Sequence, residues 1–183
     1  MKATGIVRRI DELGRVVIPK EIRRTLRIRE SDPLEIFTDR DGGIILKKYS
    51  PIGEISEHAQ ELCAALYHAF SLPAVICDKD VIVASVGFGK KDLAGHPIAE
   101  DIVASILRRA RILQLQPAEA PVQLLSGEDP SGACACLICI PVIAQSDAIG
   151  AVILLSQKPD APIDPAAVKA CEVAASFLGR QME

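Results

Sequence analysis

The sequence predicts an α+β protein of two domains: a small β-rich domain, then a larger domain with a mainly antiparallel sheet flanked by helices. Three observations support this. Residues 1–50 carry 12 Lys and Arg against 8 Asp and Glu, whereas residues 51–183 carry 9 against 16. The string Ser50-Pro51-Ile52-Gly53 interrupts the strand pattern. Beyond it, helical and strand periodicities follow in the order α-β-β-α-β-β-β-α. We therefore expect domains at 1–50 and 56–183, joined by a linker at 51–55.

The first fifty residues are expected to form short strands around one helix. β-Branched stretches predict strands at 4–10, 15–18, 34–38 and 44–48, with turn residues at 11–14 and 39–43. Pro19 suits a first helical position, which predicts a short helix over 19–26. So small a unit has too little core to be stable alone, and it offers no cysteine and no set of metal ligands. An intertwined dimer is the remaining way for it to bury apolar surface.

The second domain is expected to begin and end with a helix. Helical periodicity predicts helices at 54–70, 98–110 and 165–178, the last with Asp164 as its N-cap. Apolar and β-branched runs predict strands at 74–77, 81–86, 122–125, 134–143 and 149–156.

The first and last of these helices carry apolar stripes with the 3- and 4-residue steps of a coiled coil. We expect the stripes of different dimers to meet and to form a tetramer. The alternative is that both helices only cover their own sheet. The stripe residues are Ile55, Ala59, Leu62, Leu66, Ala69, Val168, Cys171, Ala175 and Leu178.

The N-terminal domain contains a dense basic segment. Lys20, Arg23, Arg24 and Arg27 share one face of the expected helix at i, i+3, i+4 and i+7. Arginine suits phosphates and guanine edges, and no aromatic residue is interleaved for stacking on single strands. Duplex DNA is therefore the favoured partner, and a solvated basic face is the alternative. The expected DNA-binding residues are Arg8, Arg9, Arg15, Lys20, Arg23 and Arg24.

The strings TGIVRRIDELGRVVIPKEIRRTLRI, DPLEIF and GGIILKKY closely resemble the swapped-hairpin DNA-binding domain of the AbrB-type transition-state regulators. The layout of the whole chain resembles sporulation regulators in which this domain precedes a GAF domain. The resemblance implies an intertwined β-barrel dimer that binds duplex DNA with loose sequence preference, followed by a GAF-like domain. It also implies that Arg8, Arg15, Arg23 and Arg24 contact DNA, and that the targets are late sporulation genes in the forespore.

Other motifs favour structural roles. Cys134, Cys136 and Cys139 are expected to be buried thiols rather than metal ligands, with Cys134 and Cys136 on one side of a strand and Cys139 on the other. The loop 87–90 lacks the spacing of a phosphate loop, and the three histidines form no ligand or triad spacing. The sequence contains no Asn, so the Asn-Lys-Phe-Asp-Glu pattern of cyclic-nucleotide-binding GAF domains is absent.

We therefore expect a homo-oligomeric DNA-binding transcription regulator, not an enzyme, with no cofactor and no metal. A small-molecule effector of the GAF-like domain is left open. One alternative is an antitoxin. Antitoxins with this N-terminal fold continue into a short toxin-binding tail, whereas this chain continues into the long, apolar-rich segment 51–183, which speaks against that function. The other is a ligand-handling enzyme, for which no catalytic constellation is found. No apolar signal segment follows Met1, and the apolar run 133–144 is too short for a bilayer. The expected location is cytoplasmic and nucleoid-associated, without membrane contact.

Overall fold

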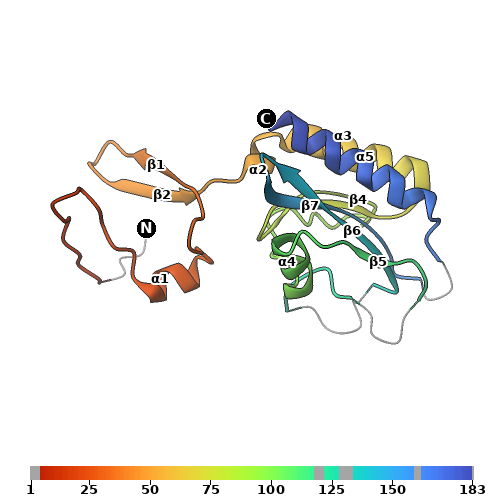
Figure 1. Cartoon of the computed structure of the whole chain (residues 1–183), viewed down its shortest axis with the longest axis horizontal. Coiled ribbons are helices and arrows are strands. Elements are labelled where there is room, and N and C mark those ends of the chain that lie inside the picture. The colour runs from red at the N-terminus through yellow and green to blue at the C-terminus, as the bar shows by residue number, and fades with distance from the viewer. Residues whose placement is uncertain (1–4, 118–121, 128–133, 159–161, 183) are drawn as a thin grey trace. The chain divides into compact units, whose positions relative to one another are not determined.

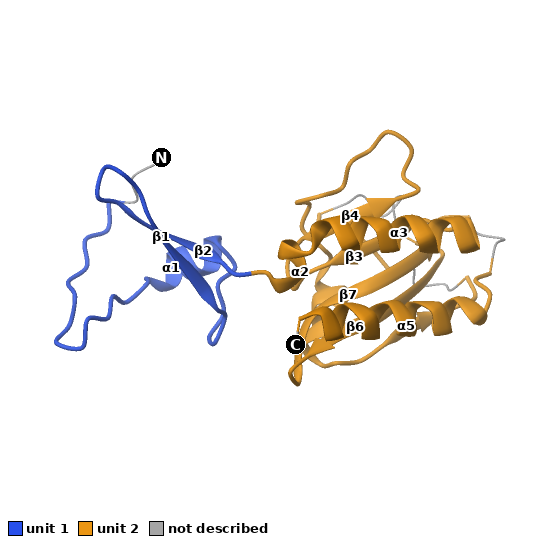
Figure 2. Cartoon of the chain, turned by 90° about the horizontal axis from the view of Figure 1, so that it is seen from above, with its two compact units in different colours: residues 1–49 blue, residues 50–183 orange. Residues whose placement is uncertain are grey.

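The computed structural model describes residues 5–117, 122–127, 134–158 and 162–182. The chain divides into two compact units, unit 1 up to Tyr49 and unit 2 from Ser50 onward (Figure 2). In chain order the elements are α1 (Lys20–Thr25), β1 (Leu34–Thr38), β2 (Ile44–Lys48), α2 (Pro51–Glu54), α3 (Ser56–Phe70), β3 (Ala74–Cys77), β4 (Ile82–Val86), α4 (Glu100–Leu107), β5 (Ile112–Gln114), β6 (Cys136–Ala144), β7 (Asp147–Ser156) and α5 (Ala166–Gln181) (Figure 1).

Unit 1 contains the antiparallel hairpin of β1 and β2, which confirms the two strands predicted there. Its turn is closed by Asp39, whose Oδ1 accepts a hydrogen bond from the backbone N–H of Gly43 at 2.6 Å. Gly42 adopts φ +81°, a conformation that glycine takes without steric cost. The register pairs Ile36 with Leu46, so both side chains lie on the same face of the hairpin.

Two other strands predicted in unit 1 do not form in the described part of the single chain. Residues 5–10 and 15–18 form no strand, and Thr4 lies outside the described residues. The turn between them does form, with Gly14 at φ +76° and its N–H bonded to the Asp11 carbonyl at 3.0 Å. A strand requires a neighbour to pair with its backbone groups. The prediction is therefore wrong for one chain by itself, because no strand in the described part of that chain pairs with these segments.

Unit 2 is built on a five-stranded antiparallel sheet in the order β4-β3-β7-β6-β5. This sheet confirms the predicted fold class of the second domain. β6 and β7 form its longest hairpin, and the two residues that connect them, Gln145 and Ser146, both have positive φ. Helices α3 and α5 lie side by side over one face of the sheet, and α4 lies on the other face (Figures 1 and 2).

The sheet of unit 2 has an apolar core on each of its faces. Ile76, Ile138 and Leu154 are buried beneath α3 and α5. On the other face, residues such as Val75 and Ile153 pack with the apolar side of α4. Neighbouring residues on β3 and β7 therefore point into different cores, and this explains why these strands are continuous apolar runs rather than alternating ones.

The segment 51–54, predicted as part of a linker, is the helical turn α2. The hydroxyl of Ser50 caps it by accepting a hydrogen bond from the Gly53 N–H at 3.2 Å. Ile52 is fully buried in the core beneath α3 and α5, which we call the first core. A Cβ at Gly150 would lie 2.5 Å from the Ile52 Cδ1 and would also clash with the Cys77 carbonyl oxygen. The absence of a side chain at Gly150 thus allows α2 to pack on the sheet.

Other boundaries of unit 2 also differ from expectation. β5 was not predicted, whereas the strand predicted at 122–125 consists of isolated bridges that join Val122 to Cys134 and Leu125 to Ile98. The helix predicted over 98–110 is shorter, as α4. Asp164 lies just before α5, and its Oδ1 accepts a hydrogen bond from the N–H of Ala166 at 2.8 Å.

All six cysteines are buried free thiols of unit 2, which confirms the burial predicted for Cys134, Cys136 and Cys139. Burial raises the pKa of Cys63 and of Cys171 to about 12, and that of Cys139 to about 11. Cys136 and Cys139 lie in different cores, as predicted for a strand. Cys134 was expected on the same side as Cys136 but lies in the core of Cys139, because it precedes β6 and strand alternation does not extend to it.

Candidate nucleic-acid interface

Helix α1 carries three of the six basic residues expected to bind DNA. Lys20, Arg23 and Arg24 are exposed, and α1 has no buried residue. Arg23 and Arg24 occupy the last turn, where a cation interacts favourably with the helix dipole. Arg27, expected on the same helical face, lies beyond the end of α1 with φ +52°. The predicted face thus has three members on the helix itself.

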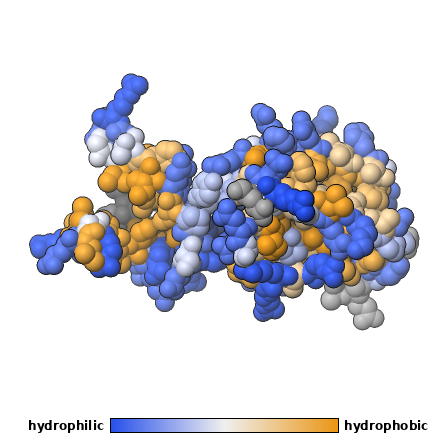
Figure 3. All heavy atoms as spheres, turned by 45° about the horizontal axis from the view of Figure 1, so that its top comes forward, coloured by the Kyte–Doolittle hydropathy of each residue, from blue (hydrophilic) through white to orange (hydrophobic). Residues whose placement is uncertain are grey.

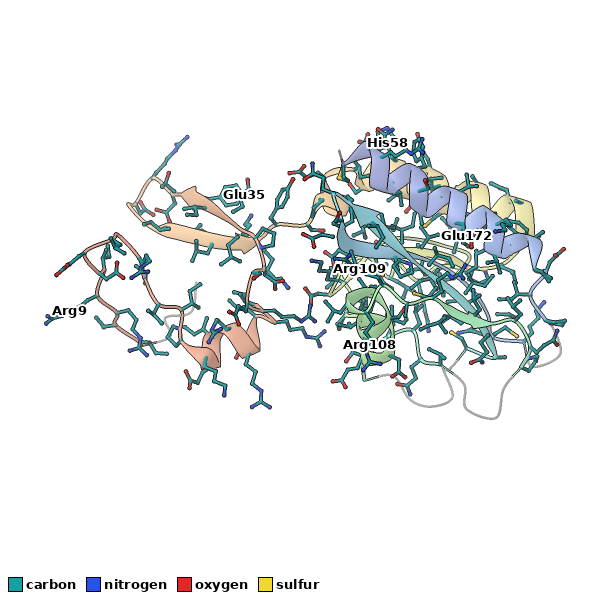
Figure 4. The ribbon with its side chains drawn as sticks, in the orientation of Figure 1. Arg9, Glu35, His58, Arg108, Arg109 and Glu172 are labelled. Carbon is teal, nitrogen blue, oxygen red and sulfur yellow. The ribbon has the colours of Figure 1, made fainter. Side chains whose placement is uncertain are left out.

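The other three expected residues, Arg8, Arg9 and Arg15, lie on either side of the turn that precedes α1 and are exposed. Figure 4 shows Arg9 pointing away from the chain. Arg15 is held by Asp11, whose Oδ2 accepts a hydrogen bond from Arg15 Nε at 2.8 Å. The backbone N–H and the guanidinium of Arg15 lower the pKa of Asp11. Sequence reasoning assigned Asp11 only to the turn, although its position four residues before Arg15 could have indicated the pair.

A second ion pair ties the segment after α1 to the hairpin. Lys48 Nζ lies 3.0 Å from Asp32 Oδ2 and also donates a hydrogen bond to the Arg27 carbonyl at 2.9 Å. The same Asp32 oxygen accepts a hydrogen bond from the Arg29 N–H at 2.8 Å. Burial alone would raise the pKa of Asp32, but Arg29 and Lys48 lower it overall. These contacts fix where the chain leaves α1 and so restrain the helix that carries the basic residues.

Unit 1 exposes most of its apolar side chains. Val7 is 89% exposed and Val17 is 71% exposed. Among the described residues of unit 1, Pro19 is the only buried one. Hydrophobic residues accordingly appear on its surface in the space-filling view (Figure 3). We call the following exposed residues the unit 1 apolar surface: Val7, Ile10, Leu13, Val16, Val17, Ile36, Ile44 and Leu46.

The residues expected to join copies of unit 2 mostly face their own sheet. The 3- and 4-residue spacing marks one side of a helix without identifying what that side packs against. In the structure this side packs on the first core, so the expectation of a free seam made of these residues is corrected. Ala59, Leu66, Cys171, Ala175 and Leu178 are buried, Ile55, Leu62 and Val168 are half-buried against that core, and Ala69 is exposed.

Helix α5 nevertheless carries a different exposed apolar pair. Val173 is 70% exposed and Phe177 is 42% exposed. They are four residues apart, so they lie on one side of the helix, one turn from each other. Neither residue was included in the predicted stripe.

The polar groups of unit 2 include an ion-pair network that joins α5 to Arg111, the residue just before β5. Glu172, which is labelled on α5 in Figure 4, accepts hydrogen bonds from Arg111 Nη1 at 2.7 Å and from Lys169 Nζ at 2.8 Å. Lys169 and Arg111 lower the pKa of Glu172.

Within the described residues, no group of three or more His, Cys, Asp or Glu is arranged to hold a metal ion. The helices in the described part of the chain are all too short or too polar to cross a bilayer.

Comparisons with known proteins match both units. The family model described as "Stage V sporulation protein T C-terminal, transcription factor" matches residues 54–183. A model described as "Antidote-toxin recognition MazE, bacterial antitoxin" matches residues 7–54. Among solved structures, the GAF domain from Acinetobacter phosphoenolpyruvate-protein phosphotransferase superposes with a TM-score of 0.58 at 12% identity, and the match covers 74% of this chain and 84% of that one. This likeness supports a GAF-like fold.

Two proteins of Bacillus subtilis (strain 168) are similar in sequence. Transition state regulatory protein AbrB is 62% identical over 63 residues, which are 31% of this chain and 65% of that protein. Stage V sporulation protein T is 50% identical over 185 residues, which cover 100% of this chain and 99% of that protein. These matches confirm both resemblances found in the sequence, that of the N-terminal strings and that of the layout of the whole chain. The chain belongs to the stage V sporulation protein T family of transcription factors.

Proposed function

We propose that the protein regulates late sporulation genes in the forespore by binding duplex DNA through unit 1 as a homo-oligomer. The observation that carries the proposal is the match along the whole chain to stage V sporulation protein T, in a chain whose unit 1 exposes all six of the basic residues expected to bind DNA. Five of these six are arginines, which are the side chains best suited to grip phosphates and guanine edges.

The DNA-binding face consists of the basic residues of α1 together with those beside the turn at 11–14. Lys20, Arg23 and Arg24 supply cations from a helix, and Arg8, Arg9 and Arg15 supply them from the adjacent segment. Contacts to phosphates position a protein on DNA without reading its sequence. A face dominated by such contacts agrees with the loose sequence preference implied by the AbrB-type resemblance.

Dimerisation is proposed to occur through the unit 1 apolar surface. The described part of unit 1 has almost no buried side chain to hold it together, whereas these residues are exposed in the single chain. A second copy would supply the missing strand neighbours for residues 5–10 and 15–18 and would bury apolar area from both chains. Such a dimer also presents its basic residues twice, with two-fold symmetry, as two DNA half-sites require.

A tetramer is proposed to form through the helical side of unit 2. The exposed pair Val173 and Phe177 supports this contact. Two linked dimers would place two DNA-binding faces in one particle. Unit 2 is also where a small-molecule effector would act, and native mass spectrometry of the purified full chain would detect one that is retained.

The test of the DNA-binding face replaces arginines one at a time in the full chain. Arg23→Ala and Arg24→Ala should each weaken binding to duplex DNA. Each should also make the negative slope of log K against log salt shallower, by about 0.9 for each phosphate that is no longer neutralised. Circular dichroism and oligomeric mass should stay as in the wild type. Arg108→Ala, which removes the same charge from unit 2, is the matched control and should leave the slope unchanged. Wild-type slopes for both α1 variants would refute the assigned face.

An antitoxin function has one observation in its favour, the match of residues 7–54 to the MazE model. It leaves most of the chain unexplained, since residues 54–183 match the sporulation family instead. Stoichiometric co-purification of a toxin with the full chain would favour the antitoxin over the regulator.

A further inference from the structure

Asp11 is an acidic residue inside the basic segment. It lies between Arg9 and Arg15, two of the residues proposed to contact DNA. A carboxylate at such a place is repelled by the phosphates of a bound duplex, so its own charge weakens binding. Any favourable effect of Asp11 on DNA binding must therefore come from the groups that its carboxylate hydrogen-bonds.

The carboxylate of Asp11 binds both the turn and one arginine. Its Oδ1 accepts hydrogen bonds from the backbone N–H of Leu13 at 3.0 Å and of Arg15 at 2.8 Å. Its Oδ2 accepts the Nε–H of Arg15 at 2.8 Å. The Asp11 N–H in turn donates to the Arg15 carbonyl at 3.0 Å. The backbone and the guanidinium of Arg15 are thus tied to the same residue.

The bond to Nε determines which edge of the guanidinium remains available. Of the five N–H donors of an arginine, one is on Nε and four are on Nη1 and Nη2. Asp11 takes the inner donor, and the Arg15 side chain is still 70% exposed. The outer pair of nitrogens, which forms bidentate contacts with phosphate or guanine, is therefore left for a ligand in a restrained orientation.

We propose that Asp11 is a positioning residue that orients Arg15 for contact with DNA. The inference rests on the proposed DNA-binding role of Arg15. An arginine on a flexible stem must lose rotamer freedom when it binds, and this ordering costs affinity. Asp11 restricts the side chain in advance, and the gain in affinity exceeds the repulsion that its charge introduces.

The proposal predicts a sign opposite to that of simple electrostatics. Asp11→Asn keeps a side-chain oxygen for the turn N–H groups but removes the charge that holds Nε. Charge alone would make this variant bind DNA more tightly. We expect it to bind roughly two- to fivefold more weakly, the range that an exposed ion pair of good geometry supports. Glu12→Gln removes the same charge from the next residue and serves as the control, with binding equal to or tighter than wild type.

The experiment is fluorescence anisotropy of the full chain on a labelled duplex, with Asp11→Asn, Glu12→Gln, Arg15→Ala and the double variant Asp11→Asn/Arg15→Ala. In the Arg15→Ala background, Asp11→Asn should no longer weaken binding and should strengthen it slightly, since only the repulsion remains to be removed. A loss of equal size in both backgrounds would assign Asp11 to the turn and overturn the proposal. Tighter binding of the single variant Asp11→Asn would overturn it as well.

Two further results keep the outcome unambiguous. If Arg15→Ala binds like wild type, the proposed DNA-binding role of Arg15 fails. If Arg15→Ala weakens binding and Asp11→Asn does not, only the positioning role fails.

The variant Arg15→Lys tests the same positioning role if Asp11→Asn does not fold. Lysine keeps the charge but has no Nε–H for Asp11 and no planar fork, so it should recover less than half of the affinity that Arg15→Ala removes. Full recovery by lysine would overturn the proposal.

Discussion

Units 1 and 2 are both rich in apolar residues, but they use these residues in opposite ways. Unit 2 buries Ile138 and Leu154 on one face of its sheet and Val75 and Ile153 on the other. In unit 1, Val17 and the rest of the apolar surface are exposed in the single chain. Apolar content alone therefore does not show where a core forms. Unit 2 completes its core within one chain, whereas unit 1 is proposed to complete its core with a second copy.

The largest expected effect comes from breaking the contact proposed between copies of unit 2. Val173→Glu together with Phe177→Glu should convert a tetramer into a dimer without unfolding unit 2, because both side chains are exposed. Apparent affinity for a duplex with two sites should fall by roughly 10²–10⁴, the gain that linkage provides when geometry permits. Light scattering gives the mass, and a duplex with a single site is the control. A dimeric wild-type protein at micromolar concentration would contradict the tetramer.

A core substitution in each unit compares the two kinds of burial directly. Ile138→Ala should lower the free energy of unfolding of unit 2 by about 2–5 kcal/mol, because the residue is fully buried. Val17→Ala should lower the stability of unit 1 by about 1–2 kcal/mol if a partner covers this side chain. Urea titrations measure both changes. A change within about 0.5 kcal/mol for Val17→Ala, as expected of an exposed site, would argue against the dimer contact.

The stabilities of the two units should depend differently on protein concentration. The chain has two tyrosines, Tyr49 in unit 1 and Tyr67 in unit 2, so Tyr67→Phe leaves a fluorescent reporter of unit 1 and Tyr49→Phe one of unit 2. In the Tyr67→Phe protein, each tenfold dilution should lower the apparent stability by about 1.4 kcal/mol, because folding is coupled to association. In the background of the Val173→Glu/Phe177→Glu variant, the unit 2 reporter should show no such dependence. A unit 1 transition that does not move on dilution would contradict dimerisation.

The smallest expected effect concerns the carboxylate of Asp32. Its pKa is lowered in the folded chain from the ordinary 3.8, so its contribution is complete above pH 3.8 and is lost as the pH falls through the folded value. Asp32→Asn should cost unit 1 about 1 kcal/mol or less at neutral pH and should remove this part of the acid dependence. Acid titration of tyrosine fluorescence in the Tyr67→Phe background measures it. An unchanged acid transition would show that the pair with Lys48 contributes nothing to stability.

The parts of the fold that could be predicted from the sequence are those in which one pattern has one structural outcome. The apolar runs of β3 and β7 are long enough to identify strands, and Asp39 with Gly42 identifies the hairpin turn. β5 spans three residues, which is too short for any periodicity to appear. The segment 15–18 has a strand composition, but it forms no strand without a neighbour, and composition does not say which chain supplies that neighbour.

The candidate site divides in the same manner. The exposure of the six basic residues could be predicted, because a short amphipathic helix and a polar turn leave charged side chains in water. The apolar stripes of α3 and α5 could be found as well, but not the surface that they contact. Helical spacing is identical for a helix on its own sheet and for one in a bundle. The close packing of α2 at Gly150 was also not predictable, since it joins residues far apart in the sequence.

The missing core of unit 1 also has a consequence for synthesis on the ribosome. Unit 1 is made first, and residues 50–183 then take roughly 7–27 s at ordinary rates of translation. During that interval its apolar surface has no shelter within its own chain. Neighbouring nascent chains on one messenger carry the same unit at high local density. Their earliest encounter would therefore be with each other, so that the two halves of a dimer would come from the same transcript.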